Sequence, residues 1–125
     1  MSSDYDWEVR PAPDASIAGT HGQGSIFARE SELRAWLGEP GEGDGEKVSR
    51  EWVVEYKAPR YARFVPATIY DWKETSLYDE ELLSPQRLRE LDYVREWHVG
   101  GHEEDAARAV QYAFAAWKNG WEVRV

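Results

Sequence analysis

Two histidines and a glycine pair occur together in the run Trp97–His102, which reads WHVGGH. The run leads from a strand-like segment into the acidic start of a helical segment, and binding sites are often built where loops join rigid elements. Gly100 and Gly101 predict a turn whose N–H groups could bind an anion, and His98 and His102 could supply a proton or a hydrogen bond. The run therefore predicts an anion site, unless the glycines only turn the chain.

A carboxylate in a second run could act together with His98. In the run 67–73 (ATIYDWK), Asp71 falls where strand alternation predicts the same face as Ile69. If the two strands pair, Asp71 could orient His98, as in general acid–base catalysis. No nucleophile elbow, phosphate-binding loop, dinucleotide fingerprint or zinc-protease motif accompanies this pair. We therefore expect no enzyme and no catalytic residue, and we expect a binding surface that includes Tyr70, Asp71, Trp72, Lys73 and Trp97.

Metal binding is not expected from the sequence. His98 and His102 have the spacing of two ligands on a helix, but the glycines between them disfavour a helix and no third ligand is evident. The acidic loop 41–46 lacks the ligand ladder of a calcium loop. The chain has no cysteine, so disulfides and thiolate sites are excluded. We expect neither a metal nor a cofactor.

One basic cluster interrupts an acidic chain. Lys57, Arg60 and Arg63 lie close in sequence to Tyr61 and Phe64, and interleaved arginines and aromatic rings suit stacking on bases or capture of phosphate. Solvated charges also collect at hairpin tips without any such role. We expect Arg60 and Arg63 to contribute to a surface for a protein or a small nucleotide.

Length and charge restrict the class of protein and its partners. The 125 residues fit one domain. Lys and Arg number 15 against 24 Asp and Glu, and the net charge of −9 repels long nucleic acids and anionic membranes. No apolar run approaches the length needed to span a bilayer, and no signal peptide begins the chain. The sequence therefore predicts a soluble, intracellular protein.

The hydrophobic pattern predicts an α+β fold. Helical periodicity indicates a helix capped by Ser31, a helix that begins at Ser84, and a long helix at Glu103–Asn119. Period-two alternation and apolar runs indicate strands at 48–57, 64–72, 95–99 and 121–125. We expect a small, mainly antiparallel sheet of three to five strands, with the long C-terminal helix packed on one face and one or two short helices.

Three finer expectations accompany this fold. Residues 1–24 are expected to form an extended N-terminal arm, and residues 25–125 a single domain. Pro66 cannot donate to a strand ladder, so it is expected at an edge or a bulge. The strand 121–125, if left at a sheet edge, could pair across a homodimer.

Two runs, ATIYDWK at 67–73 and EWHVGG at 96–101, carry a resemblance that spans about residues 25–116. In these runs and their order the chain resembles a group of small proteins carried by tailed phages of actinobacteria and other bacteria. The resemblance transfers no activity, so no residue inherits a catalytic role from it. It implies a setting, which is a non-virion phage protein that acts in the host cytoplasm.

These observations together predict a binding protein. The leading hypothesis is a phage-type accessory protein that inhibits a host protein such as a defence complex, in the manner of an anti-CRISPR or another anti-defence protein. One alternative is a sponge for a nucleotide-like anion near Tyr70, Lys73, His98 and the glycine pair. Another is a small hydrolase that uses His98 and Asp71. The inhibitor predicts an exposed aromatic patch, the sponge a concave pocket, and the hydrolase a hydrogen bond between His98 and Asp71.

Overall fold

The computed structural model describes residues 7–120 and has one five-stranded antiparallel sheet. The strands lie in the order β1-β3-β4-β5-β2. Their bounds are β1 (Glu8–Pro11), β2 (His21–Ala28), β3 (Glu51–Lys57), β4 (Val65–Tyr70) and β5 (Arg95–Gly101). Each neighbouring pair is antiparallel. The predicted strands 48–57 and 64–72 are confirmed as β3 and β4, which pair as a hairpin.

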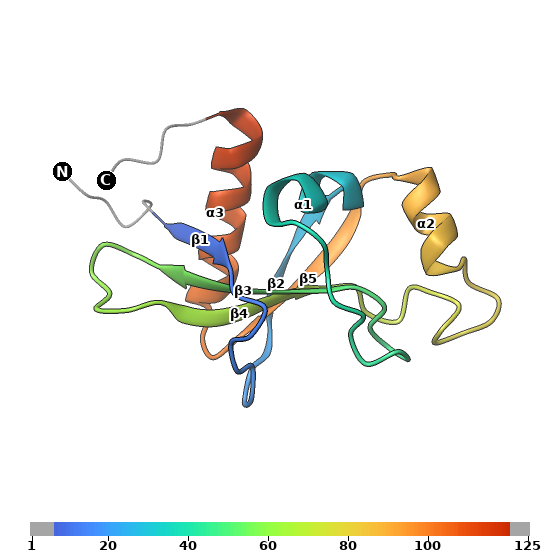
Figure 1. The fold of residues 1–125 in the computed structure, drawn as a ribbon, viewed down its shortest axis with the longest axis horizontal. Coiled ribbons are helices and arrows are strands. Elements are labelled where there is room, and N and C mark those ends of the chain that lie inside the picture. The colour runs from blue at the N-terminus through green and yellow to red at the C-terminus, as the bar shows by residue number, and fades with distance from the viewer. Residues whose placement is uncertain (1–6, 121–125) are drawn as a thin grey trace.

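The described part of the chain also has three helices: α1 (Glu30–Leu37), α2 (Pro85–Leu91) and α3 (Asp105–Asn119). Figure 1 shows α1 and α3 on one side of the sheet, whereas the loop between β1 and β2 hangs on the opposite side. Helix α2 lies apart from them, at the end of the molecule away from the β3–β4 hairpin. The predicted α+β fold, with a C-terminal helix packed on the sheet, is confirmed.

Helix α3 packs through small and medium apolar side chains. Ala106, Val110 and Phe114 are buried at helical spacing, which removes one stripe of the helix from water. Gly120 adopts the left-handed conformation (φ 67°), and its N–H donates to the carbonyls of the last turn, as a C-terminal cap requires. The predicted end of this helix is confirmed, and its start lies at Asp105, two residues later than expected.

The strands divide their side chains between a covered face and an open face. In β3, Trp52, Val54 and Tyr56 are buried under the helices, whereas the alternate residues are only half buried. The register carries this division across the sheet, because Trp52 pairs with Ile69 and Ile69 pairs with Val99. We use "covered face" for this helix side and "open face" for the other. An antiparallel sheet with one face packed and the other toward solvent gives this alternation.

The expected turn at Gly100 and Gly101 is wrong, because both glycines belong to β5. Gly100 pairs with Thr68, and Gly101 pairs with Ala67. A Cβ at Gly101 would clash with Ala106 of α3, and a Cβ at Gly100 would lie 2.6 Å from the Thr68 hydroxyl oxygen. The pair is therefore explained by close packing within a strand, and its N–H groups are not gathered into an anion-binding turn.

The expected boundary between an arm and a domain falls inside β2. Residues 8–11 form β1 at one edge of the sheet, and β2, which begins at His21, forms the other edge. Trp7 is buried in the core. Residues 7–24 thus belong to the domain. The sequence did not reveal these two strands, because β1 is too short to show alternation and glycines interrupt the alternation in β2.

Four smaller expectations also have outcomes. Ser31 does not cap α1, because the helix begins one residue earlier and the Ser31 N–H and hydroxyl donate to the Asp92 carboxylate instead. Ser84 caps α2 as expected and accepts from the Arg87 N–H. Pro66 lies at the end of β4 that β5 does not reach, as its missing N–H requires. The predicted strand 121–125, with its role in a homodimer, lies outside the described residues.

Candidate functional site

His98 and Asp71 lie on opposite faces of the sheet. Tyr70 is the cross-strand partner of His98, so their side chains share the open face. Asp71 is the next residue and points to the covered side, where it is fully buried, while the His98 side chain is 31% exposed. No hydrogen bond joins His98 to Asp71 within residues 7–120. The predicted pair is therefore wrong, because alternation along β4 separates the two groups.

The Asp71 carboxylate is held by backbone and side-chain donors at the end of the sheet. One oxygen accepts from the Ser49 N–H at 2.7 Å and the Arg50 N–H at 3.1 Å, and the other accepts from the Ser49 hydroxyl. The Arg95 guanidinium lies 3.6 Å away. These donors compensate the loss of water around a buried charge. Asp71, which follows β4, therefore holds the segment that leads into β3 in place.

Arg95 extends this arrangement into a buried ion network. It contacts Glu30 of α1 at 3.3 Å and Glu74 at 2.9 Å. Glu30 is 1% exposed and also pairs with Arg34 at 2.8 Å and with Arg50 at 3.6 Å. Buried charges persist where partners and hydrogen bonds satisfy them. The network joins α1 to the sheet, and sequence reasoning missed it because its members are far apart in the chain.

The open face carries a row of polar and aromatic side chains that crosses four strands. Glu51 pairs with Tyr70, Tyr70 with His98, and His98 with Ser25. The Tyr70 and His98 rings are stacked with centroids 5.8 Å apart, and Trp72 meets Tyr70 edge-on at 6.3 Å. Two of the predicted runs, 67–73 and 96–101, therefore do come together, on the open face.

A hollow of about 190 Å³ opens beside this row. Gly100 and Gly22 are cross-strand partners, and because neither has a side chain they leave the open face recessed there. The loop between β1 and β2 forms one wall, and Figure 1 shows this loop on the side of the sheet away from α1 and α3. The hollow is lined by Ile17, Thr20, His21, Val48, Glu51, Thr68, Tyr70, Trp72 and Gly100.

Glu51 is the acidic group of the hollow. Burial, together with the negative charge of Asp44, raises the pKa of the Glu51 carboxyl. Burial, together with the Glu51 charge, also raises the pKa of the Tyr70 phenol. Within residues 7–120, the Glu51 carboxylate has no ion pair and no hydrogen bond. It is thus a partly desolvated acceptor without an intramolecular donor.

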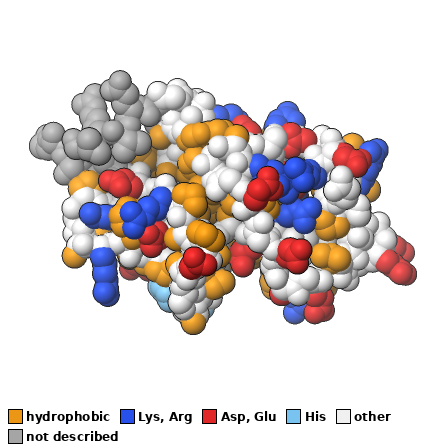
Figure 2. Space-filling model, viewed as in Figure 1, with side chains coloured by type: hydrophobic (Ala, Val, Ile, Leu, Met, Phe, Trp, Pro, Cys, Tyr) orange, Lys and Arg blue, Asp and Glu red, His pale blue; other side chains and the backbone are white. Residues whose placement is uncertain are grey.

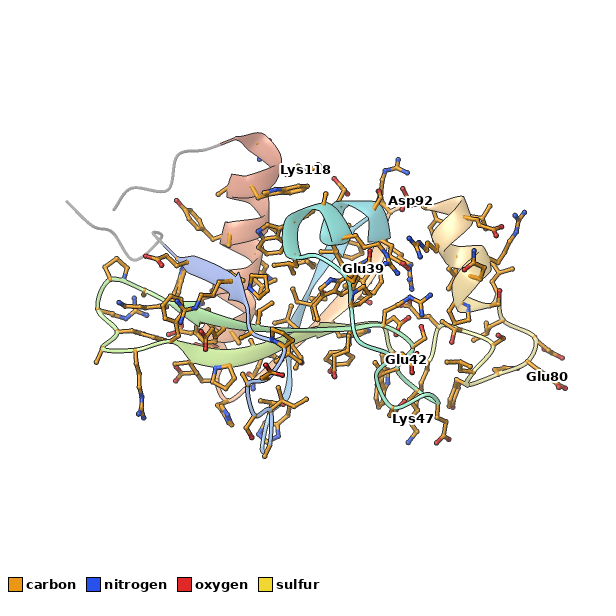
Figure 3. All side chains as sticks on the ribbon, in the orientation of Figure 1. Glu39, Glu42, Lys47, Glu80, Asp92 and Lys118 are labelled. Carbon is orange, nitrogen blue, oxygen red and sulfur yellow. The ribbon has the colours of Figure 1, made fainter. Side chains whose placement is uncertain are left out.

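Two lysines contact Trp72, one of the residues that line the hollow, and Lys73 also contacts the Tyr78 ring. The Lys47 and Lys73 ammonium groups are 5.9 Å and 5.4 Å from the centre of the Trp72 ring, within the range of a cation–π contact. Lys73 adopts a left-handed backbone (φ 57°), and its N–H donates to the Lys47 carbonyl at 2.7 Å. Figure 3 shows Lys47 on the open side of the sheet. The hollow therefore combines a carboxylate, aromatic walls and a cationic margin.

The remaining predicted residues have other positions. Trp97 is fully buried and its indole N–H donates to the Ala28 carbonyl at 3.0 Å, so it belongs to the core. Arg60 contacts Asp105 at 3.1 Å and joins the β3–β4 loop to the start of α3. Arg63 is exposed. His102 is exposed beyond the end of β5 and lies near Gly19.

Tyr61 strengthens the connection between the β3–β4 loop and α3. Its hydroxyl lies 2.6 Å from Asp105 and 3.0 Å from Glu103. Burial and these two carboxylates raise the pKa of the Tyr61 phenol. The basic loop is therefore tied to the acidic helix start. The Arg60 guanidinium pairs with Asp105 and lies 5.1 Å from the centre of the Trp7 ring, and its contribution to a ligand surface stays a prediction.

A second surface, which we term the acidic lobe, comprises residues 75–94 between β4 and β5. Seven of its large apolar side chains are 38–48% exposed, whereas Leu88 is buried. Leu91, on the same helix as Leu88, is thus on the surface. Figures 2 and 3 show apolar side chains beside acidic ones at this end of the molecule, with Glu80 at the tip of the lobe. The exposed apolar residues are Leu77, Tyr78, Leu82, Leu83, Leu91, Tyr93 and Val94.

Comparisons with known proteins do not place the chain in a family. No family model matches it, and no curated protein matches its sequence significantly. Within the described part of the chain, no group of three or more His, Asp or Glu side chains could hold a metal ion. No helix among residues 7–120 is long and apolar enough to cross a bilayer. The site must therefore be interpreted from its own geometry.

Proposed function

We propose that this protein acts by binding and that its principal partner is a host protein, such as a component of a defence complex, in the host cytoplasm. The resemblance of the runs 67–73 and 96–101 to tailed-phage proteins supports a host partner. A small hydrolase built on His98 and Asp71 is not proposed, because the sheet separates the two side chains. The proposed activity is inhibition by occupation of the partner's surface.

The observation that carries this proposal is the composition of the acidic lobe. Large apolar side chains rarely gather on the surface of a protein that has no partner, and such patches with polar rims are typical of interaction sites. The lobe contains five carboxylates and two arginines, and the whole chain has a net charge of −9. A partner with an apolar surface and a basic rim complements both properties.

The lobe is also attached firmly enough to present one surface. The two residues that flank it, Glu74 and Arg95, form an ion pair at 2.9 Å. Near its end, the Asp92 carboxylate accepts from the Ser31 N–H of α1 at 3.0 Å. Inside it, the Ser76 N–H donates to the Leu83 carbonyl at 2.9 Å. A surface that is already ordered loses less conformational entropy on binding.

Affinity capture followed by reconstitution tests this proposal. The tagged protein is used to capture partners from a lysate of the bacterial host, and the captured protein is purified and titrated back by calorimetry. We expect a stoichiometric complex. Leu83→Lys and Leu91→Lys should each weaken it at least about tenfold, because each places a charge in an apolar contact.

Phe27→Lys is the matched control. Among residues 7–120, Phe27 is the most exposed large apolar residue outside the lobe, at 66%, and its replacement changes the net charge by the same amount. It should leave the affinity unchanged. Full affinity in both lobe variants, or an equal loss in Phe27→Lys, would contradict the assignment of the lobe.

A second candidate function is sequestration of a small nucleotide-like ligand, and the hollow is the observation that favours it. A pocket that joins the β3–β4 hairpin to Gly100 is what such a ligand requires, and aromatic rings and two lysines border it. A thermal-shift screen of nucleotides, run beside the capture experiment, separates the two functions. A shift with one nucleotide and no stoichiometric host protein would favour sequestration.

A further inference from the structure

We propose that the hollow on the open face binds the guanine base of a mononucleotide, with the ribose and phosphate outside it toward Lys47 and Lys73. This inference rests on the second candidate function, nucleotide sequestration, and names the base that is recognised. It does not depend on the host-protein surface of the lobe.

The size of the hollow selects a single ring system. Sites that enclose a whole drug-sized ligand have volumes of about 300–1,000 Å³. The hollow has about 190 Å³, which leaves room for a base but not for a complete nucleotide. A ligand of this kind must therefore extend from the hollow across its margin.

The walls of the hollow suit a planar ring. Tyr70 and Trp72 meet edge-on with centroids 6.3 Å apart, so two aromatic surfaces of different orientation border the same space. Val48 and Ile17 add aliphatic contacts. Stacking of a base on an aromatic side chain contributes about 1–3 kcal/mol and tolerates any base. The walls thus favour a base without choosing among bases.

The choice of base comes from Glu51. A carboxylate only accepts hydrogen bonds, and its two oxygens match two adjacent N–H donors. Guanine presents such a pair, the ring N1–H and the 2-amino group, on one edge. Adenine and cytosine present one amino group beside an unprotonated ring nitrogen, which repels a carboxylate. Within residues 7–120, no group donates a hydrogen bond to the Glu51 carboxylate. The N1–H and 2-amino groups of guanine would supply these missing donors.

The positive charges beside the hollow can bind one phosphate. The Lys47 and Lys73 ammonium groups lie within 6 Å of the Trp72 ring centre, close to the wall on which the base would stack. The net charge of −9 opposes a long polyanion. The arrangement therefore favours a mononucleotide over a nucleic acid strand.

A titration of the full chain with guanosine, inosine and adenosine 5′-monophosphates tests the proposal. We expect chemical-shift changes in ¹H–¹⁵N NMR spectra at Tyr70, Trp72 and Gly100, and about tenfold tighter binding of the guanine than of the adenine nucleotide. The inosine nucleotide keeps the ring N1–H but lacks the 2-amino group, so it should bind with intermediate affinity. Guanosine without phosphate should bind more weakly than its monophosphate.

Glu51→Gln gives the sharpest variant. Its side chain both accepts and donates, so it matches the adenine edge, and we expect the preference to change from guanine to adenine. Lys73→Asn, which tolerates the left-handed backbone, should remove much of the advantage of the monophosphate over guanosine. Glu96→Gln, which removes a carboxylate elsewhere on the open face, should bind like the original chain.

Two results would overturn the inference. If no guanine compound changes the NMR signals of the hollow, or if Glu51→Gln leaves the preference for guanine intact, Glu51 does not recognise the base. Tight binding of another nucleotide in the hollow would reject guanine but keep sequestration as a function. A host-protein complex with no nucleotide binding at all would reject sequestration and leave the lobe proposal standing. Gly100→Ala, which narrows the hollow without touching Glu51, should weaken every nucleotide equally.

Discussion

Asp71 and His98 are close in the fold and yet stand in different environments. Asp71 is fully buried among Ser49, Arg50 and Arg95. His98 is partly exposed, stacks on Tyr70, and lies 3.9 Å from the Glu96 carboxylate. The same two strands, β4 and β5, carry both groups. The covered face binds its charges to one another, whereas Glu51 on the open face has no such partner among residues 7–120.

This contrast shows why residue types alone misassign chemistry. A His and an Asp on paired strands suggest an acid–base pair, but a shift of one residue along a strand moves a side chain to the other face. On the covered face, a charge must find internal partners because water is excluded. On the open face, Glu51 can remain without such a partner because its side chain is only partly buried.

The largest expected effect is at Asp71. Asp71→Ala removes the acceptor for three donors and leaves Arg95 less well compensated, so we expect the free energy of unfolding to fall by about 3–5 kcal/mol. Denaturant-induced unfolding followed by tryptophan fluorescence measures it. His98→Ala is the matched change on the open face and should alter the free energy by less than about 0.5 kcal/mol. Equal losses in the two variants would remove the distinction between the faces.

Gly101 offers a second test of the covered face. Gly101→Ala would force its Cβ against Ala106 of α3, and overpacking of this kind costs about 1–3 kcal/mol. Equilibrium unfolding in denaturant measures the loss. Gly101→Ala should leave nucleotide binding unchanged, since its Cβ points away from the hollow. A stable variant with a blocked hollow would show that we have assigned Gly101 to the wrong face.

Tyr61 tests the boundary between the β3–β4 loop and α3. Tyr61→Phe should lower the free energy of unfolding by about 1–2 kcal/mol through loss of its bonds to Asp105 and Glu103. Because the folded pKa of Tyr61 is raised above the usual 10, its contribution is fully present below pH 10 and is lost as the pH rises above 10. The difference in free energy of unfolding between Tyr61→Phe and the original chain should therefore shrink in alkaline solution. A difference that stays constant from pH 8 to 11 would argue against these hydrogen bonds.

Glu51 should have the smallest effect on stability. Burial raises its pKa in the folded chain, so folding favours the protonated carboxyl. The free energy of unfolding should therefore increase as the pH falls through the raised pKa toward 4.5, the ordinary value. In Glu51→Gln this increase should disappear, and at pH 7 the variant should be within about 0.5 kcal/mol of the original chain. A clear loss of stability at pH 7 would mean that Glu51 has a structural partner.

The architecture could be predicted from the sequence because its signals are local. Alternation in β3, the apolar stripe of α3 and the proline after Ser84 each depend on neighbouring residues. The length of β5 could not be predicted from the sequence, because Gly100 and Gly101 are strand residues only through contacts with Thr68 and Ala106. In the candidate site, Tyr70, Trp72 and Gly100 were found from their types. Glu51 was missed, since a carboxylate in an alternating strand looks like any solvated residue.

A double-mutant cycle between Asp71 and His98 tests the separation of the two faces most directly. The free energies of unfolding are measured for Asp71→Ala, His98→Ala, the double variant and the original chain. Independent sites give additive effects within about 0.3–0.5 kcal/mol, and our account predicts such additivity. The corresponding cycle between Asp71 and Arg95 should give a clear coupling. A coupling above about 1 kcal/mol between Asp71 and His98 would show that they act as a pair and would contradict the account.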